Sequence, residues 1–105
     1  MKIEWIAEYL KDLKHYRKKL QSIDDDLEDV IFILRKKPVQ RPPFSYRIEG
    51  LGIKTCVIKV KKISCRSLKG KGVNSGLRLV YAHFEDEERI VLVELYHKAD
   101  KEMED

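Results

Sequence analysis

Apolar residues in the first third of the chain recur at spacings of three and four, which is typical of amphipathic helices. The first predicted helix carries Ile6, Tyr9, Leu10, Leu13, Tyr16 and Leu20 on one face, and the second carries Ile23, Leu27, Val30, Ile31 and Leu34. Ser22, with Asp25 three residues later, predicts a capping box at the start of the second helix, and Pro38 ends it. The two helices are therefore expected to form an antiparallel hairpin whose shared apolar face needs a sheet to cover it.

The period changes to two in the second half of the chain, which indicates strands. Cys56, Ile58 and Val60 alternate with more polar residues, and Ile63 and Cys65 continue on the other parity, so a bulge is expected near residues 61–62. The β-branched and aromatic runs 77–84 and 89–96 flank the acidic residues 85–88, which predicts a hairpin with a solvated tip.

The remaining segments complete a fold class. Residues 2–5 alternate and predict a short first strand, whereas residues 38–53 hold all three prolines and two glycines and predict a connection with little regular structure. Helices followed by strands favour an α+β fold, in which the N-terminal helical hairpin packs on a small twisted antiparallel β-sheet.

The length of 105 residues predicts a single domain spanning residues 1–105. No apolar run approaches the roughly 20 residues that cross a bilayer, and a signal-peptide pattern is missing, so a cytoplasmic protein is expected, with no membrane partner. Cys56 and Cys65 lie in strand-like patterns without the spacing of metal ligands. They are interpreted as reduced core residues, and neither a metal site nor a cofactor is expected.

Charge is distributed unevenly along the chain. The net charge is +4, yet residues 36–78 contain 12 Lys and Arg against the single acid Glu49. A segment this basic attracts polyanions, among which phosphate is the commonest in biology. The alternative is a solvated lysine-rich face that binds nothing.

Three stretches carry a resemblance to a known family: "SYRIEGLGIK", "CRSLKGKGVNSGLRLVYAHF" and "RIVLVELYHKADKE", in this order behind a helical hairpin. Over essentially its whole length the chain resembles the RelE/HigB-type toxins of type II toxin–antitoxin systems, within the RelE/ParE superfamily. The resemblance implies a compact antiparallel sheet backed by two helices and a ribosome-dependent endoribonuclease that cleaves mRNA and inhibits translation. It also implies a cognate acidic antitoxin as the partner.

The resemblance extends to site residues. Lys69 and Lys71 match two lysines that precede the "SGxRLVY" segment, and Arg78 matches the arginine within it that contacts the scissile phosphate. His97 and Lys98 fall where relatives place a catalytic basic residue or histidine. Ala99 stands where some relatives have an arginine. Relatives also carry a tyrosine near the end of the chain that stacks on a base, and Tyr96 is the nearest candidate for that role here.

The chemistry of RNA cleavage fits these residue types. RNA supplies its own nucleophile, the 2'-hydroxyl, so a protein must orient the backbone, transfer two protons and stabilise charge on phosphorus. Arg78 offers a planar fork for two phosphate oxygens, Lys71 can act as base or electrostatic clamp, and His97 or Lys98 can transfer a proton. These four are the predicted catalytic residues. The predicted RNA-binding residues are Lys59, Lys61 and Arg66 on the outer side of the sheet, with Lys69 and Tyr96.

Other interpretations stay open at this point. Lys69 and Lys71 could be solvated turn residues, Arg78 could pair with Glu94, and His97 could be a hydrogen-bonded structural residue. At the level of function, the alternatives are a ParE-like toxin that inhibits DNA gyrase and a non-catalytic RNA-binding protein.

Overall fold

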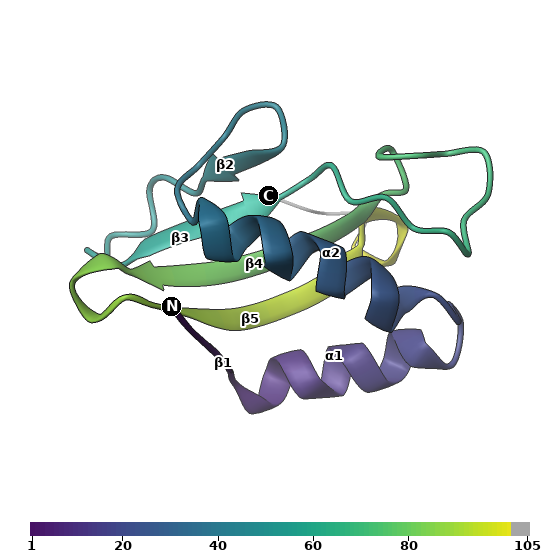
Figure 1. Ribbon diagram of the computed structural model, residues 1–105, viewed down its shortest axis with the longest axis horizontal. Helices are drawn as coiled ribbons and strands as arrows, with labels where there is room; N and C mark the ends of the chain where they lie inside the picture. The colour runs from purple at the N-terminus through teal and green to yellow at the C-terminus, as the bar shows by residue number, and fades with distance from the viewer. Residues whose placement is uncertain (102–105) are drawn as a thin grey trace.

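The computed structural model describes residues 1–101 and shows two helices on one face of a five-stranded sheet (Figure 1). The elements follow the chain in the order β1 (Lys2–Trp5), α1 (Ala7–Arg17), α2 (Ile23–Lys36), β2 (Ser45–Arg47), β3 (Cys56–Val60), β4 (Leu77–Phe84) and β5 (Arg89–His97). Short 3-10 turns, Glu85–Glu87 and Lys98–Asp100, follow β4 and β5. The predicted helices, first strand and hairpin are confirmed, and Glu85 to Glu88 form an exposed tip. Neither helix in the described part of the chain has the length and apolarity needed to span a membrane.

The strands lie in the order β1-β5-β4-β3-β2. All neighbours are antiparallel except β1, which runs parallel to β5 with Lys2 opposite Arg89 and Trp5 opposite Leu92. The sheet is therefore mixed, whereas a wholly antiparallel one was expected. Strands β1 and β5 are separated in sequence by both helices and three other strands, so no tight turn forces them to run antiparallel.

One face of the sheet and the inner faces of both helices form the core. The fully buried sheet residues on this face are Ile58, Val60, Leu77, Leu79, Tyr81, Ile90, Leu92 and Leu95. They pack with Tyr9, Leu13 and Tyr16 of α1 and with Ile23, Leu27, Val30 and Leu34 of α2. Both cysteines are free; Cys65 is buried and Cys56 is half-buried.

The predicted capping box at Ser22 is wrong. The Ser22 hydroxyl makes no capping bond to the helix backbone; it donates to Asp26 Oδ2 (2.6 Å) and accepts the Ser67 N–H (2.9 Å). Asp26 is itself buried and accepts the Arg66 N–H (3.3 Å to Oδ2). Both side chains therefore fix the loop after β3 to α2, which outweighs capping because it satisfies a buried carboxylate.

The change of parity after β3 has the expected bulge-like geometry. The N–H groups of Lys61 and Lys62 both point to the Phe44 carbonyl oxygen, at 2.9 and 3.3 Å. Val60 and Ile63, on either side of them, are both fully buried. The shared carbonyl lets two successive lysines lie at the end of β3 without exposing the apolar residues that follow.

Candidate nucleic-acid interface

The sheet face opposite the helices carries a grid of polar and aromatic side chains, called here the outer face. Strand register places Tyr46 of β2 opposite Lys59 of β3, and Lys59 opposite Val80 of β4. In the next row, Arg78 of β4 lies opposite Tyr96 of β5. Because side chains of paired residues share a face, the four strands β2 to β5 present these cations and tyrosines on the same side.

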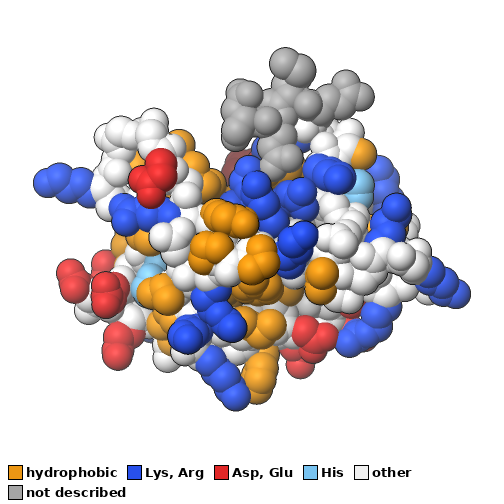
Figure 2. Space-filling model, turned by 90° about the horizontal axis from the view of Figure 1, so that it is seen from above, with side chains coloured by type: hydrophobic (Ala, Val, Ile, Leu, Met, Phe, Trp, Pro, Cys, Tyr) orange, Lys and Arg blue, Asp and Glu red, His pale blue; other side chains and the backbone are white. Residues whose placement is uncertain are grey.

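A cleft of about 280 Å³ opens at one end of this face. We call it the basic cleft, and its lining residues are Pro43, Tyr46, Lys61, Lys62, Asn74, Gly76, Arg78 and Lys98. Figure 2 shows Lys and Arg side chains gathered near the middle of the face that it views, beside a group of apolar side chains. Four cations around one hollow make this the place where the described residues best fit a phosphate.

Arg78 lines the basic cleft and donates hydrogen bonds to backbone oxygens. Its Nη1 donates to the carbonyl oxygens of Lys61 (3.2 Å) and Leu77 (3.3 Å). Glu94, the acid considered as its partner, forms an ion pair with Lys101. These two backbone acceptors help to orient the guanidinium.

Lys62 and Lys98 line the basic cleft with Arg78 and are fixed there by different contacts. The Lys62 ammonium donates to Asn74 Oδ1 (2.9 Å), so that loop 61–76 holds it at the cleft. The Lys98 backbone N–H donates to the Gly76 carbonyl oxygen (2.9 Å), which ties the end of β5 to the start of β4. Lys98 therefore lies among the cleft residues together with Arg78.

His97 is the last residue of β5 and does not line the basic cleft. Its Nε2 lies 2.9 Å from the Ser75 carbonyl oxygen, and its Nδ1 accepts the Ala99 N–H (3.0 Å). Because Nδ1 accepts a hydrogen bond, the neutral ring carries its proton on Nε2, and this N–H donates a hydrogen bond to the Ser75 carbonyl oxygen. The two ring nitrogens are both engaged within the protein, a geometry that favours a positioning role.

A further network holds the turn that follows His97. The Tyr16 hydroxyl accepts the His97 N–H (2.8 Å) and donates to Asp100 Oδ2 (2.5 Å). Burial, together with the Asp100 hydrogen bond, raises the pKa of Tyr16 to about 12. The same hydrogen bond lowers the pKa of Asp100 below its ordinary value, so α1 anchors the segment that carries Lys98.

Tyr96 lies on the outer face and is only 6% exposed. The ammonium groups of Lys101 and Lys59 lie 4.4 and 5.7 Å from its ring centroid. Lys59 belongs to the outer face as predicted, and Lys61 lies at its edge over Tyr46. In this arrangement the Tyr96 ring is covered by lysines, so a base could stack on it only after they move.

The other predicted RNA-binding residues lie elsewhere. The expectation that Arg66 lines the outer side is wrong, because its guanidinium pairs with Asp29 (2.9 Å) and Asp26 (3.6 Å) of α2. Lys69 and Arg66 border a separate hollow beside Lys19. Lys71 is exposed in the turn before Asn74 and does not line the basic cleft.

Sequence reasoning did not assign Tyr46, Lys62 or Asn74 to the site. Tyr46 falls in the proline-rich stretch, where a three-residue strand is too short to show a period of two. Lys62 entered the prediction only as part of the bulge, and in the structure both lysines of the bulge line the cleft. Two consecutive lysines at the point where the alternation of apolar residues changes parity are the signal that could have identified Lys62.

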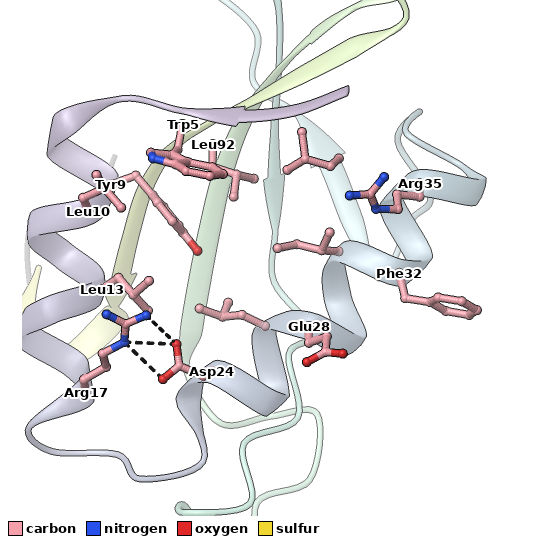
Figure 3. A pocket seen from close by; sticks show the side chains of 13 residues that line it. Trp5, Tyr9, Leu10, Leu13, Arg17, Asp24, Glu28, Phe32, Arg35 and Leu92 are labelled. Atoms are coloured by element: carbon pink, nitrogen blue, oxygen red, sulfur yellow. Dashed lines mark hydrogen bonds and ion pairs between the residues drawn. The ribbon is translucent and has the colours of Figure 1, made fainter. Parts of the chain in front are cut away.

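A larger hollow of about 530 Å³ lies between α1, α2 and β1 (Figure 3). Trp5, Leu10 and Phe32 are exposed along it, and an Arg17–Asp24 ion pair (2.9 Å) bridges the two helices at one end. Its walls are mainly apolar and its arginines already have partners, with Arg35 donating to the Met1 carbonyl oxygen. The basic cleft is therefore the better binding site for a phosphate.

Within residues 1–101, no three His, Cys, Asp or Glu side chains come together as a metal site would require.

Comparison with known proteins identifies the fold. No model of a protein family and no curated protein matches the sequence. Among solved structures, a metal-bound toxin from Helicobacter pylori matches with a TM-score of 0.64 and 20% identity, over 95% of this chain and 97% of that one. A copper-bound mutant toxin from H. pylori gives a TM-score of 0.61 and 19% identity over the same shares. A chain of the Escherichia coli DinJ–YafQ complex gives a TM-score of 0.61 and 13% identity, over 93% of each chain.

These matches extend over nearly the whole chain, so its fold is that of the toxins. The predicted α+β class, with two N-terminal helices on a small sheet, is thereby confirmed. At 13 to 20% sequence identity, these structural matches establish the fold alone, so the activity has to be argued from the site.

Proposed function

We propose that this chain is the toxin of a type II toxin–antitoxin system and acts as a ribosome-dependent mRNA endoribonuclease that inhibits translation. The observation that carries the proposal is the basic cleft, in which Lys61, Lys62, Arg78 and Lys98 surround one hollow on the helix-free face of a toxin fold. The resemblance of residues 65–84 and 89–102 to RelE/HigB-type toxins supports the same activity.

The proposed reaction uses the RNA as its own nucleophile. The 2'-oxygen attacks the adjacent phosphorus, the bond to the 5'-oxygen breaks, and the products are a 2',3'-cyclic phosphate and a 5'-hydroxyl. Arg78 binds two non-bridging oxygens and stabilises the charge that develops on them. Lys98 donates a proton to the departing 5'-oxygen, and a neutral lysine at the cleft removes the proton of the 2'-hydroxyl.

Lys62 is better placed than Lys71 to be that base, since its ammonium group lies at the cleft beside Asn74. Lys71 stays a candidate for a phosphate contact along the RNA, because it projects from the exposed turn that leads into the cleft. His97 is proposed to position Lys98 through its bonds to Ser75 and Ala99. Since nucleophile, acid, base and charge stabilisation are all supplied by RNA and side chains, cleavage is expected to proceed in EDTA.

The partner proposed for the free toxin is a cognate acidic antitoxin, encoded by an adjacent gene. An acidic segment would cover the basic cleft, because opposite charges there attract and a free toxin would act in its own cytoplasm. The E. coli neighbour was solved as a complex of two proteins, DinJ and YafQ. Co-expression of the adjacent genes should yield a stable complex, and failure of any adjacent product to co-purify would contradict the toxin proposal.

The activity is tested by incubating the chain with translating ribosomes and mapping the new mRNA ends, with a DNA gyrase supercoiling assay alongside. Cleavage that requires ribosomes supports the proposed function. Inhibited supercoiling without cleavage would favour a ParE-like toxin, and RNA binding without either effect would favour a non-catalytic RNA-binding protein.

A further inference from the structure

Tyr46 presents an accessible aromatic ring at the basic cleft. It is 39% exposed and lines the cleft together with Arg78 and Lys61. The Lys61 ammonium lies 5.3 Å from its ring centroid. Tyr96, the other tyrosine of this part of the outer face, lies under Lys59 and Lys101 and is 6% exposed. Tyr46 is therefore the ring that an incoming flat group would meet beside the cations.

The backbone holds Tyr46 in place from both sides. Before it, the Ser45 N–H donates to the Arg41 carbonyl oxygen (3.1 Å), and the buried Ser45 hydroxyl accepts the Arg41 N–H (2.9 Å). After it, the Arg47 N–H donates to Gln40 Oε1 (2.9 Å), and the Ile48 N–H donates to the Val57 carbonyl oxygen (2.8 Å). The ring is thus mounted on a fixed strand, which lowers the entropy lost when a ligand stacks on it.

We propose that Tyr46 is a stacking platform for an unpaired nucleobase of the RNA whose phosphate lies against Arg78 and Lys61. This inference rests on the proposed function and extends it, because it assigns a base-binding subsite to a residue outside the predicted set. A cationic groove next to an exposed aromatic ring is the arrangement by which proteins bind single-stranded nucleic acid. A double helix keeps its bases stacked on each other, so the subsite selects a single strand. Purines have the larger stacking surface, so a purine is expected to be preferred at this position.

The test uses the full chain and a fluorescent single-stranded RNA that is fully 2'-O-methylated, so that binding is measured without cleavage. Tyr46→Phe keeps the ring and should bind like the parent. Tyr46→Ala and Tyr46→Leu remove the ring, the second with its apolar bulk kept, and should each bind about tenfold more weakly. The salt dependence of binding should stay as in the parent, because no phosphate contact is lost.

Phe32→Ala is the matched control, since Phe32 on α2 is also an exposed ring, 59% accessible, with the Lys36 ammonium 4.5 Å from its centroid. It should leave RNA affinity unchanged. Thermal unfolding of every variant shows whether a loss of affinity reflects a loss of folded protein.

Oligonucleotides with a single abasic position make the test specific for stacking. At one position, removing the base should weaken binding to the parent about tenfold and should not weaken binding to Tyr46→Ala further. If Tyr46→Ala binds as tightly as the parent, or if every abasic position costs both proteins equally, the stacking inference is wrong. If the parent cleaves mRNA and Tyr46→Ala keeps the parent's RNA affinity, this inference alone is wrong. If binding shows the predicted stacking but the chain never cleaves mRNA, the proposed activity is wrong and the base-binding subsite stands.

Discussion

The imidazole of His97 packs directly against Gly76, so closely that a Cβ atom at Gly76 would lie 2.7 Å from His97 Nε2. Gly76 has a φ of +89°, and its carbonyl oxygen accepts the Lys98 N–H (2.9 Å). The hydrogen bond joins Gly76, which directly precedes β4, to Lys98, which directly follows β5. Arg78 lies two residues after Gly76 on β4. Gly76 therefore sets the separation of two cations of the basic cleft.

Gly76→Ala is expected to destabilise the protein by about 2 to 4 kcal/mol, since it adds a clash with His97 to the strain of a positive φ. Gly70→Ala is the matched control: Gly70 also has a positive φ (+79°), but an added Cβ there has no neighbour within 4 Å. It should cost only about 1 to 2 kcal/mol. Urea unfolding of both variants measures the difference, and equal losses would show that the His97 contact contributes nothing.

Asp100→Asn should reduce stability at neutral pH by at most about 1 kcal/mol, through the weaker bond that an amide accepts from Tyr16. Because folding lowers the pKa of Asp100 from its ordinary 3.8, the carboxylate stabilises the fold above about pH 4. That contribution is lost as the pH falls through the lowered value. The stability gap between parent and variant, measured by urea unfolding, should therefore be constant from about pH 5 to 8 and close below about pH 4. Asp86→Asn, in the exposed acidic tip, is the control and should show no such gap.

Most of the fold was predictable because its local signals agree with each other. The helices carry continuous apolar faces, and the hairpin of β4 and β5 combines long apolar runs with a polar tip. The parallel pairing of β1 was not predictable, because alternation in residues 2–5 gives a strand without its partner or direction. Strand β2 was missed since three residues flanked by prolines and glycines show no periodicity.

The site was predictable only in part. Arg78 and Lys98 could be placed on adjacent strand ends from the hairpin alone, and the structure brings both to the basic cleft. The partners of Arg66 could not be predicted, since Asp26 and Asp29 are 40 and 37 residues away in sequence and meet it through tertiary packing. The engagement of both His97 nitrogens depends on backbone groups of Ser75 and Ala99, which leave no trace in residue identity.

RNA binding should weaken steeply as salt rises, because each neutralised phosphate releases counterions. Lys61→Ala should lower the slope of log affinity against log salt by about one, as expected for one lost phosphate contact. Lys36→Ala removes a cation from α2, away from the cleft, and should change neither slope nor affinity appreciably. Fluorescence anisotropy at about 50 to 300 mM salt measures both, and affinity that stays flat across this range would contradict phosphate recognition.

His97→Gln should keep both limbs of the pH–rate profile and lose less than about tenfold in rate, because the His97 ring binds Ser75 and Ala99 rather than lining the cleft. Lys98→Met, which removes the proposed proton donor, should slow cleavage by about a hundredfold or more. Single-turnover cleavage rates from about pH 5.5 to 9 compare the two. A limb that disappears in His97→Gln would assign proton transfer to His97 and displace Lys98 from that role.

The most direct test of the proposed activity is the rate at which Arg78→Ala cleaves mRNA on translating ribosomes, measured beside the parent and Lys36→Ala. Arg78 is the group proposed to stabilise the charge on phosphorus, and losing such a donor slows chemistry by about a hundredfold or more. We expect that loss for Arg78→Ala, a rate near the parent's for Lys36→Ala, and 2',3'-cyclic phosphate ends formed in the presence of EDTA. If Arg78→Ala cleaves as fast as the parent, the basic cleft is not the catalytic site.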